Sequence, residues 1–321
     1  MVGQRTLNPF IYVRIVVRQQ GTVQLNKFMK SEKPPIDGGS KDNHSKMFYL
    51  KDGRALEYFE YGDRDGTPLV YCHGFPSTGM QASLVDDLAK EMHARVISPT
   101  RPGMGRSTYK PGRKILDFPR DLKELTDKLG VERFGVLGVS GGGPYALAAA
   151  LELQDRVTVV GTASSVGRNT ARLRQQLPLL FRAGFAASGT NIGSKTTVEL
   201  VDRVFKAIGK SPVDFIIARE SKVDLPREEI ERQTDDAFRQ GAKGPAREAY
   251  LIANDWGFNP RAIKRAVHIW YGDNDKIVPG EAFEDFKRIF PKAKTEIYPG
   301  EGHFAVLKHM REVLSSLLAY N

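Results

Sequence analysis

The sequence has one cysteine and no long apolar segment. Cys72 ends the apolar run LVYC, so the chain has no internal disulfide framework, which fits a reducing compartment. The apolar run at residues 10–17 contains Arg14 and is shorter than the roughly 18 residues that a membrane-spanning helix needs. We therefore expect a buried, unreactive thiol at Cys72, no transmembrane helix and no signal-peptide core.

Dense blocks of Lys and Arg are missing as well, although the net charge is +10 and the isoelectric point is near 9.5. A basic excess serves nucleic-acid or membrane binding when it forms a patch. Here the basic residues are spread along the chain, and no zinc-finger, RRM or helix-turn-helix pattern accompanies them. We expect a solvated basic surface and no nucleic-acid partner.

Acidic residues are absent from residues 1–31, which contain five Lys and Arg residues. This charge resembles that of a mitochondrial transit peptide, whereas the β-branched, Ser-poor composition does not. A Pro- and Gly-rich stretch typical of a linker follows at residues 30–46. We expect residues 1–45 to be a disordered or weakly ordered extension of a cytoplasmic protein, with mitochondrial targeting as the alternative.

Short apolar runs and helical patterns alternate after this extension. Two strands around a tight turn at Asp52-Gly53 come first. The next apolar runs lie at residues 68–72, 95–99, 133–139 and 156–163, and the helical patterns lie at residues 78–91, 117–129 and 144–153. This βαβ alternation predicts an α/β fold, in which helices cover both faces of a mostly parallel sheet.

The alternation stops at about residue 165, where a long stretch with helical periodicity begins. Strands resume at residues 266–272 and 294–299, and a closing helix is predicted at residues 304–319. The simplest explanation is an insertion between two strands of the same sheet.

The domain organisation follows from this insertion. We expect a core made of residues 46–164 and 261–321, with residues 165–260 inserted as a helical unit. Large apolar residues of the insertion either line a pocket or form the core of the insertion, and we expect the second: Leu179, Phe181, Phe185, Phe215 and Trp256.

Residues 138–142 read Gly-Val-Ser-Gly-Gly, a G-x-S-x-G pattern between a predicted strand and a predicted helix. A sharp strand-to-helix turn exposes the serine, and the small residues Gly138 and Gly142 relieve the crowding of such a turn. The helix begins at Ser140, so its free N–H groups and positive end face the hydroxyl. We expect Ser140 to be a nucleophile and the N–H of Gly141 to stabilise an oxyanion. A Gly-rich turn that serves packing or anion binding is the structural alternative.

The sequence His-Gly-Phe-Pro at residues 73–76 follows a predicted strand directly. A loop at this place brings a second N–H, that of Phe75, to the same oxyanion, and Gly74 lets the backbone turn close to the substrate. We expect His73 to bond loop backbone rather than to transfer protons.

One of the six histidines has the placement of a catalytic base. His303 follows a strand through the Gly-rich turn PGEGHF, where a side chain overhangs the carboxyl edge of a parallel sheet. The others lie in the linker, in the loop at residues 73–76, at a helix end, in a strand and in the last helix: His44, His73, His93, His268 and His309. We therefore expect His303 to be the base.

The acid that orients this base should come from another strand end. The segment YGDNDKIVP follows the strand at residues 266–272 and offers Asp273 and Asp275, whereas the strand ending near Ala163 is followed by two serines. We take Asp275 as the acid and expect Asp273 to help form the turn. The order along the chain is then Ser, Asp, His.

Four motifs resemble those of the α/β-hydrolase fold superfamily. They are HGFP at 73–76, RPGMGRS at 101–107, GVSGGG at 138–143, and GDNDKIVP with GEGHF downstream. The resemblance runs from about residue 46 to the end of the chain. It implies an eight-stranded type of mostly parallel sheet flanked by helices, with residues 165–260 as a helical cap over the site.

The same resemblance implies a role for each candidate residue. Ser140 matches the nucleophile, Asp275 the acid and His303 the base, while Phe75 and Gly141 match the oxyanion donors. We expect a small-molecule substrate, and neither a cofactor nor a metal.

The serine nucleophile narrows the chemistry within this superfamily. Haloalkane dehalogenases and epoxide hydrolases of the fold use aspartate, so Ser140 argues against both. We expect hydrolysis of a carboxylic ester or lactone through an acyl-enzyme. The alternatives are carbon–carbon bond hydrolysis, aminopeptidase or cofactor-free haloperoxidase chemistry, and a non-catalytic ligand-binding role.

One position departs from the pattern of the superfamily. Many relatives have an acidic residue directly before the stretch RPGMGRS, and this chain has Thr100. We therefore expect the ion pair between this position and the neighbouring arginine to be missing, with an effect on loop stability rather than on catalysis.

Overall fold

The computed structural model describes residues 44–176, 196, 199 and 227–320. Of the predicted extension at residues 1–45, only His44 and Ser45 lie within these ranges, and the rest lies outside the described residues. Ser45 pairs with Phe59 of the neighbouring strand, so regular structure begins with this residue.

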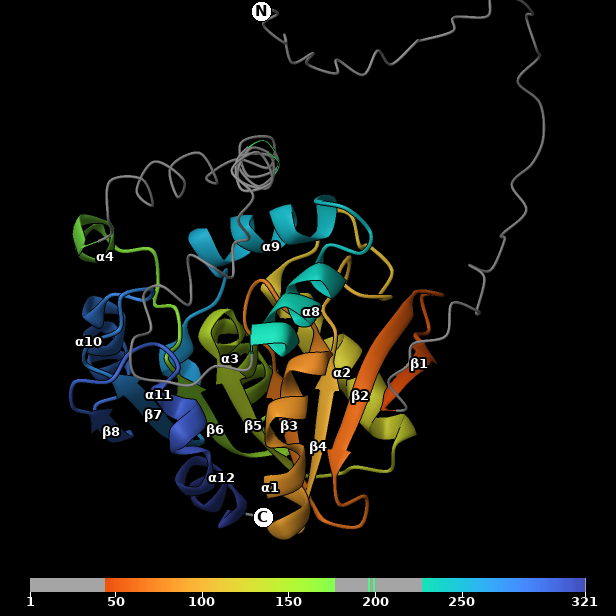
Figure 1. Cartoon of the computed structure of the whole chain (residues 1–321), viewed down its shortest axis with the longest axis horizontal. Helices are drawn as coiled ribbons and strands as arrows, with labels where there is room; N and C mark the ends of the chain where they lie inside the picture. Colours follow the sequence, from red (N-terminus) through yellow and green to blue (C-terminus); the bar gives the residue numbers. More distant parts are fainter. Residues whose placement is uncertain (1–43, 177–195, 197–198, 200–226, 321) are drawn as a thin grey trace, which may run out of the picture. The chain divides into compact units, whose positions relative to one another are not determined.

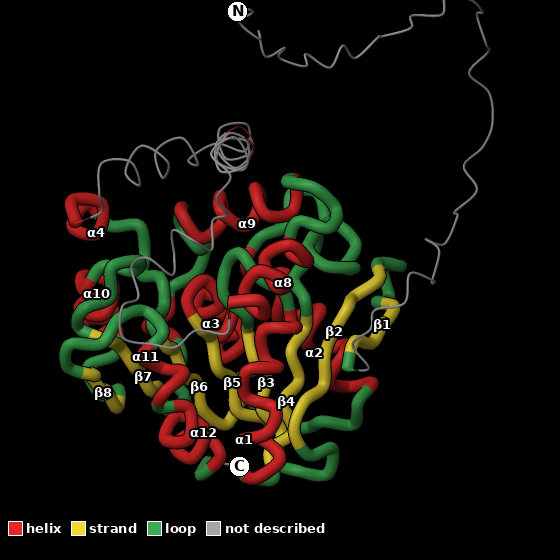
Figure 2. Tube along the Cα trace, in the orientation of Figure 1, coloured by secondary structure: helices red, strands yellow, loops and turns green. Residues whose placement is uncertain are grey.

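The described residues form one eight-stranded sheet in the order β1-β2-β4-β3-β5-β6-β7-β8 (Figures 1 and 2). Its strands are β1 (Ser45–Tyr49), β2 (Ala55–Gly62), β3 (Thr67–Cys72), β4 (Ala94–Pro99), β5 (Phe134–Val139), β6 (Val157–Ala163), β7 (Ala266–Gly272) and β8 (Lys294–Tyr298). Strand β2 runs antiparallel to β1 and β4, and the other neighbours are parallel. The predicted α/β class and the mostly parallel sheet are confirmed.

The central strands are buried on both faces, which explains their continuous apolar sequences. Along β3, Val70 and Cys72 belong to one hydrophobic core, while Leu69 and Tyr71 belong to the other. Successive side chains of a strand point to opposite faces, so one strand serves both cores. Burial raises the pKa of the Cys72 thiol to about 12, which keeps this residue protonated and unreactive near neutral pH.

Helices cover both faces of the sheet (Figure 1). One face packs against α2 (Phe118–Lys128), α3 (Gly143–Glu152) and α10 (Gly280–Ile289), and the other packs against η1 (Gly79–Val85), α1 (Asp86–Glu91), α11 (Ala305–Lys308) and α12 (Met310–Leu318). Three further 3₁₀ turns are η2 (Ile115–Asp117), η3 (Ser140–Gly142) and η4 (Pro260–Ala262).

The segment between β6 and β7 contains α4 (Ala171–Gln176), α8 (Arg227–Ala237) and α9 (Lys243–Ala253) in its described parts. Helices α8 and α9 lie beyond the carboxyl ends of the parallel strands (Figure 1). Three hydrogen bonds fasten α8 to the segment after β3: Thr78 Oγ1 donates to Asp236 Oδ2 over 2.9 Å, Ser83 Oγ to Glu229 Oε1 over 2.8 Å, and Ser77 Oγ to Gln233 Oε1 over 3.3 Å. The described helices of the insertion therefore rest on the edge at which the strands end.

Three details differ from the sequence prediction. The closing helix predicted at residues 304–319 is divided at His309 into α11 and α12. Helix α10 was not predicted, although Phe283, Phe286 and Ile289 recur at helical spacing and are buried. Trp256 belongs to the main core, where its ring lies 6.3 Å from that of Phe286, and not to a separate core of the insertion. The other residues of that prediction lie outside the described residues: Leu179, Phe181, Phe185 and Phe215. A short amphipathic helix is stabilised mainly by the surface against which it packs. The core that an aromatic residue joins at a domain border is likewise decided by its packing partners.

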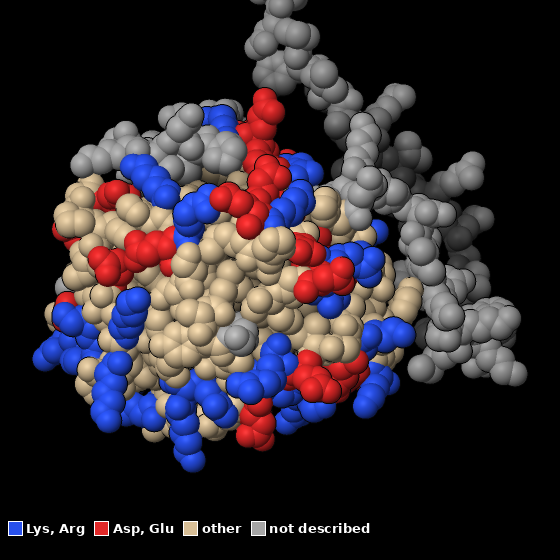
Figure 3. All heavy atoms as spheres, turned by 90° about the horizontal axis from the view of Figure 1, so that it is seen from below, with Lys and Arg blue, Asp and Glu red and all other residues tan. Residues whose placement is uncertain are grey.

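Charges of both signs lie around an uncharged centre on the face shown in Figure 3. The basic excess of the sequence is thus accompanied on this face by acidic side chains. Within residues 44–176 and 227–320, no helix combines the length and apolar character that a bilayer crossing requires.

Candidate active site

Ser140 stands on a strained turn between β5 and α3. Its φ angle is +51°, a left-handed conformation that residues with a side chain rarely adopt. The glycines around it allow very close backbone contacts: a Cβ atom on Gly142 would lie 1.9 Å from the carbonyl oxygen of Cys72, and one on Gly138 would lie 2.6 Å from that of Gly142. The G-x-S-x-G pattern is thus explained by backbone packing that holds the serine hydroxyl at the strand end.

His303 lies between the hydroxyl of Ser140 and the carboxylate of Asp275. Its Nε2 atom is 3.0 Å from Ser140 Oγ, and its Nδ1 atom is 2.7 Å from Asp275 Oδ2. A carboxylate only accepts hydrogen bonds, so Nδ1 carries the proton and Nε2 presents its lone pair to the serine. His303 and Asp275 are both buried, which protects this chain of hydrogen bonds from water.

The carboxylate of Asp275 is fixed by backbone donors as well. Its Oδ1 atom accepts hydrogen bonds from the N–H groups of Ile277 and Val278, each over 2.8 Å. Asp273 instead accepts a hydrogen bond from the N–H of Gly300 over 2.6 Å and thereby connects the loops after β7 and β8. The structure brings together Ser140, Asp275 and His303 and leaves Asp273 in a turn, as the sequence suggested.

The two expected oxyanion donors lie beside the serine. The backbone around Phe75 and that around Ser140 approach each other closely. A Cβ atom added to Gly141 would lie 3.4 Å from the amide nitrogen of Phe75, and a Cβ atom added to Gly74 would lie 3.5 Å from Cβ of Ser140. Among the described residues the N–H of Phe75 has no hydrogen-bond acceptor. Two backbone N–H groups are therefore available next to the hydroxyl, at the amino end of α3.

His73 is buried and takes no part in this chain of groups. Its Nδ1 atom lies 2.9 Å from the carbonyl oxygen of Gly74, and its Nε2 atom accepts a hydrogen bond from the N–H of Arg101 over 3.2 Å. Burial, and secondly the guanidinium of Arg101, lower the pKa of His73 well below its ordinary value, so the ring is neutral. The prediction that His73 bonds loop backbone is confirmed.

Arg101 has an ion-pair partner, although not at the position before it. Thr100 accepts a hydrogen bond from the N–H of Gly79, and the carboxylate comes from Glu248 of α9, whose Oε1 atom lies 2.8 Å from Nε of Arg101. The expected loss of a pair with residue 100 is therefore compensated by a residue almost 150 positions later in the chain. The sequence alone carries no signal for so distant a pairing.

Gln81 is a further residue that the sequence did not point to. Its Oε1 atom accepts hydrogen bonds from the N–H of Gly74 over 2.7 Å and from the hydroxyl of Tyr71 over 3.4 Å. The backbone donor at Gly74 fixes which end of the amide is oxygen. The loop that carries Phe75 is thus held from the side of η1 as well as by Arg101.

A small cavity of about 80 Å³ opens beside Ser140 and His303. Its apolar lining includes Leu84 of η1, Ile230 of α8, Ile277 and Phe304 of the loops after β7 and β8, and Val306 and Leu307 of α11. None of the described residues that line this cavity is Asp, Glu, Lys or Arg. Within the same described ranges, no group of three or more His, Cys, Asp and Glu side chains is arranged to hold a metal ion.

Comparison with known proteins agrees with this architecture. The model of the alpha/beta hydrolase fold family matches residues 67–309. A bifunctional esterase/perhydrolase from Acinetobacter calcoaceticus is 25% identical over 281 residues, which cover 84% of this chain and 97% of that protein. The acetyltransferase component of the acetoin cleaving system of Pseudomonas putida is 28% identical over 273 residues, which cover 84% of this chain and 67% of that protein.

A solved structure of a thermophilic esterase from Thermogutta terrifontis superimposes with a TM-score of 0.63 at 20% identity, covering 86% of this chain and 98% of that chain. At this identity the likeness shows the shared fold. The family model, by contrast, matches more than half of the sequence, including the segments that carry Ser140, Asp275 and His303. The protein therefore belongs to the α/β-hydrolase fold family.

Proposed function

We propose that this hydrolase cleaves a carboxylic ester or lactone through an acyl-enzyme on Ser140. One observation carries the proposal: the unbroken line of contacts from Ser140 Oγ through the ring of His303 to the buried carboxylate of Asp275. A serine hydroxyl becomes a good nucleophile when a base within hydrogen-bond reach takes its proton. The strained turn at Ser140 presents the hydroxyl to this base.

In the first half-reaction the Oγ atom of Ser140 attacks the carbonyl carbon of the substrate, and Nε2 of His303 takes the hydroxyl proton. The carbonyl oxygen becomes an oxyanion, which the N–H groups of Phe75 and Gly141 stabilise. Collapse of the tetrahedral adduct breaks the bond to the leaving oxygen, which receives the proton from His303. Asp275 stabilises the imidazolium that exists between these two transfers.

In the second half-reaction a water molecule takes the place of the leaving alcohol. His303 accepts a proton from this water as its oxygen attacks the acyl carbon, and then returns the proton to Oγ of Ser140. Over both half-reactions one ester and one water are converted to a carboxylic acid and an alcohol, and the enzyme is regenerated. In a lactone the leaving oxygen and the acid remain in one molecule.

The walls of the cavity favour an uncharged, largely apolar substrate over the aminopeptidase alternative. Binding the free ammonium group of a peptide calls for a carboxylate near the nucleophile, and the described lining residues offer none. An ester or lactone requires only the two oxyanion donors and apolar contacts. The esterase names of the Acinetobacter and Thermogutta relatives point in the same direction.

A fluorophosphonate probe combined with a substrate panel tests the proposal. We expect the probe to modify Ser140 and no other residue, and to fail in His303→Ala, because the serine then lacks its base. In the panel, p-nitrophenyl esters and lactones should be turned over, whereas amino-acid p-nitroanilides should not. Labelling without turnover of any ester would favour another reaction of the fold, and no labelling at all would favour the non-catalytic role.

A further inference from the structure

The peptide group between Gly74 and Phe75 is held firmly on its carbonyl side. The carbonyl oxygen of Gly74 lies 2.9 Å from Nη2 of Arg101 and 2.9 Å from Nδ1 of His73. A trans peptide is planar, and its N–H points opposite to its carbonyl group. Fixing the carbonyl oxygen of Gly74 therefore fixes the direction of the Phe75 N–H, which is the proposed oxyanion donor.

The guanidinium of Arg101 donates hydrogen bonds to two successive carbonyl groups of this loop. Its Nη1 atom donates to the carbonyl oxygen of His73 over 2.6 Å, and its Nη2 atom donates to that of Gly74. The rigid fork of a guanidinium suits this geometry, because both donors lie in one plane. The plane also lies over the ring of Tyr145 in α3, with Cζ 4.6 Å from the ring centroid.

Glu248 of α9 holds this guanidinium in place. Its Oε1 atom lies 2.8 Å from Nε of Arg101, and neither residue is exposed by more than 1%. The N–H of Nε does not point at the carboxylate with hydrogen-bond geometry, so the contact is an ion pair at close range. The other oxygen, Oε2, accepts a hydrogen bond from the hydroxyl of Tyr145 over 2.9 Å and also contacts Arg113.

The charges of this cluster favour an ionised Glu248. Burial alone would raise the pKa of its carboxyl group, but the guanidinium groups of Arg101 and Arg113 outweigh burial and lower it. Two buried cations thus share one buried anion, and loss of the anion would leave both cations uncompensated. Helix α9 is therefore connected, through Arg101, to residues 73–76, which we call the oxyanion loop, by an ion pair that is costly to break.

We propose that Arg101, held by Glu248 of α9, is a positioning residue that orients the Phe75 N–H toward the oxyanion. The position of α9 then influences the rate of the chemical step. The inference rests on the proposed function, since it assigns a task to the Phe75 N–H in that reaction. A positioning role of the Arg101–Glu248 pair can be distinguished from a purely structural role by experiment. A structural pair affects the fraction of folded protein, whereas a positioning pair changes the turnover of protein that is folded.

Two lysine substitutions distinguish these roles. Arg101→Lys keeps a positive charge near Glu248, but a single ammonium group cannot hold both carbonyl groups in the same way. Arg113→Lys is the matched control, because Arg113 shares the carboxylate of Glu248 and makes no contact with the oxyanion loop. Glu248→Gln is the second test variant, which keeps the side-chain shape and removes the charge.

The measurements are kcat and KM for a p-nitrophenyl ester, the affinity for an alkyl trifluoromethyl ketone, and amide hydrogen exchange at Phe75. We expect Arg101→Lys to lower kcat between about tenfold and a hundredfold with KM nearly unchanged, somewhat less than the full loss of an oxyanion donor. Affinity for the ketone, which forms an oxyanion adduct with Ser140, should fall by a similar factor. Exchange at Phe75 should accelerate, because the loop is less firmly held.

Glu248→Gln should show the same pattern with a smaller decrease of kcat, about threefold to tenfold, and Arg113→Lys should change kcat by less than about twofold for folded protein. Equal kcat and ketone affinity in Arg101→Lys and Arg113→Lys would overturn the positioning role. If the wild-type protein turns over no ester, the proposed function fails, and the exchange rate at Phe75 still decides whether Arg101 fixes this amide.

Discussion

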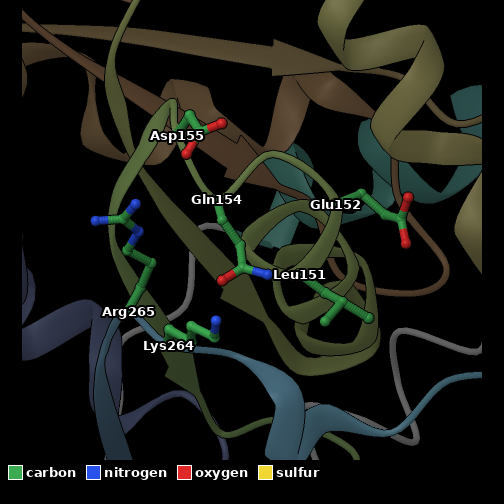
Figure 4. Close-up of a pocket in the computed structure, with 6 residues that line it drawn as sticks. All are labelled: Leu151, Glu152, Gln154, Asp155, Lys264 and Arg265. Carbon is green, nitrogen blue, oxygen red and sulfur yellow. The ribbon is translucent and has the colours of Figure 1, made fainter.

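Two hollows lie at opposite edges of the parallel strands, and the larger one is not beside Ser140. A hollow of about 610 Å³ lies at the amino edge, between the end of α3 and the segment before β7 (Figure 4). Its lining residues are Leu151, Glu152, Gln154, Asp155, Lys264 and Arg265. The cavity beside Ser140 at the carboxyl edge has only about 80 Å³.

The difference between the two hollows lies in how their polar groups are held. None of the six residues at the amino edge is buried, and Figure 4 shows the carboxylate of Glu152 pointing away from Gln154 and Lys264. At the carboxyl edge, Asp275 and His303 are buried and the oxygens of Asp275 have three hydrogen-bond donors. Catalysis depends on such preorganised groups, so their convergence, rather than the size of the hollow, makes the carboxyl edge the candidate site.

The sharpest test of this contrast removes one group from each hollow. Ser140→Ala should lower kcat/KM for an ester by about a thousandfold or more, because the nucleophile is lost while the fold is kept. Lys264→Ala at the amino edge should leave kcat/KM within about twofold. Steady-state kinetics with a p-nitrophenyl ester measures both, and more than a tenth of wild-type activity in Ser140→Ala would contradict the assignment.

A second test compares two carboxylates in one loop. Asp275→Asn should reduce kcat on the order of a hundredfold to ten-thousandfold, since an amide stabilises neither the required tautomer of His303 nor its imidazolium. Asp273→Asn should cost less than about threefold, because its partner is a backbone N–H outside the cavity. The reverse ranking of the two kcat values would move the acid to Asp273.

A third test compares one glutamine from each hollow. Gln81→Met removes the acceptor of the Gly74 N–H, and the loss of one such hydrogen bond should lower kcat about twofold to tenfold through the oxyanion loop. Gln154→Met should leave kcat unchanged. Parallel kinetic measurements on the two variants suffice, and equal behaviour would mean that Gln81 does not help to hold the loop.

The smallest expected effect concerns stability and pH. The pKa of His73 is lowered in the folded protein by burial and by Arg101, whereas the unfolded chain titrates near the ordinary value of 6.5. The unfolded state therefore binds more protons below pH 6.5, and stability falls as the pH decreases through this value. Between pH 7.5 and 5.5 the loss from His73 should reach about 1.4 kcal/mol.

The matched variant for this effect is His73→Asn, which keeps a donor and no longer titrates. The difference between the melting temperatures at pH 7.5 and 5.5 should be smaller in the variant than in the wild type, by about 2 °C. His268, whose pKa is lowered chiefly by burial, is present in both proteins and cancels in the comparison. An identical pH dependence in the two proteins would show that His73 takes up a proton in the folded state.

Much of the site could be predicted because its residues follow strand ends. Ser140 comes directly after β5, whereas Asp275 and His303 lie in the loops that follow β7 and β8, and parallel strands bring their carboxyl ends to one edge. Local turn patterns were therefore enough to bring together residues separated by more than 130 positions.

Gln81 and Glu248 could not be predicted in this way. Gln81 lies within a 3₁₀ turn and Glu248 lies in the middle of α9, and neither position has a characteristic sequence pattern. Their roles depend on which backbone atoms the folded chain places opposite them, as with Gly74 for Gln81 and Arg101 for Glu248. Helix α10 was missed for a different reason, since its apolar spacing is visible in the sequence but short.

Cys72 offers a built-in reporter of motion at the site. It is the only cysteine of the sequence, it is buried, and its carbonyl oxygen lies against Gly142 of the nucleophile turn. Its side chain packs in the hydrophobic core that contains α2 and α3, so a thiol reagent reaches it only when this core opens, and the rate of modification measures how often that happens. The native chain thus allows opening of the core beneath the nucleophile turn to be timed in solution without any engineered label.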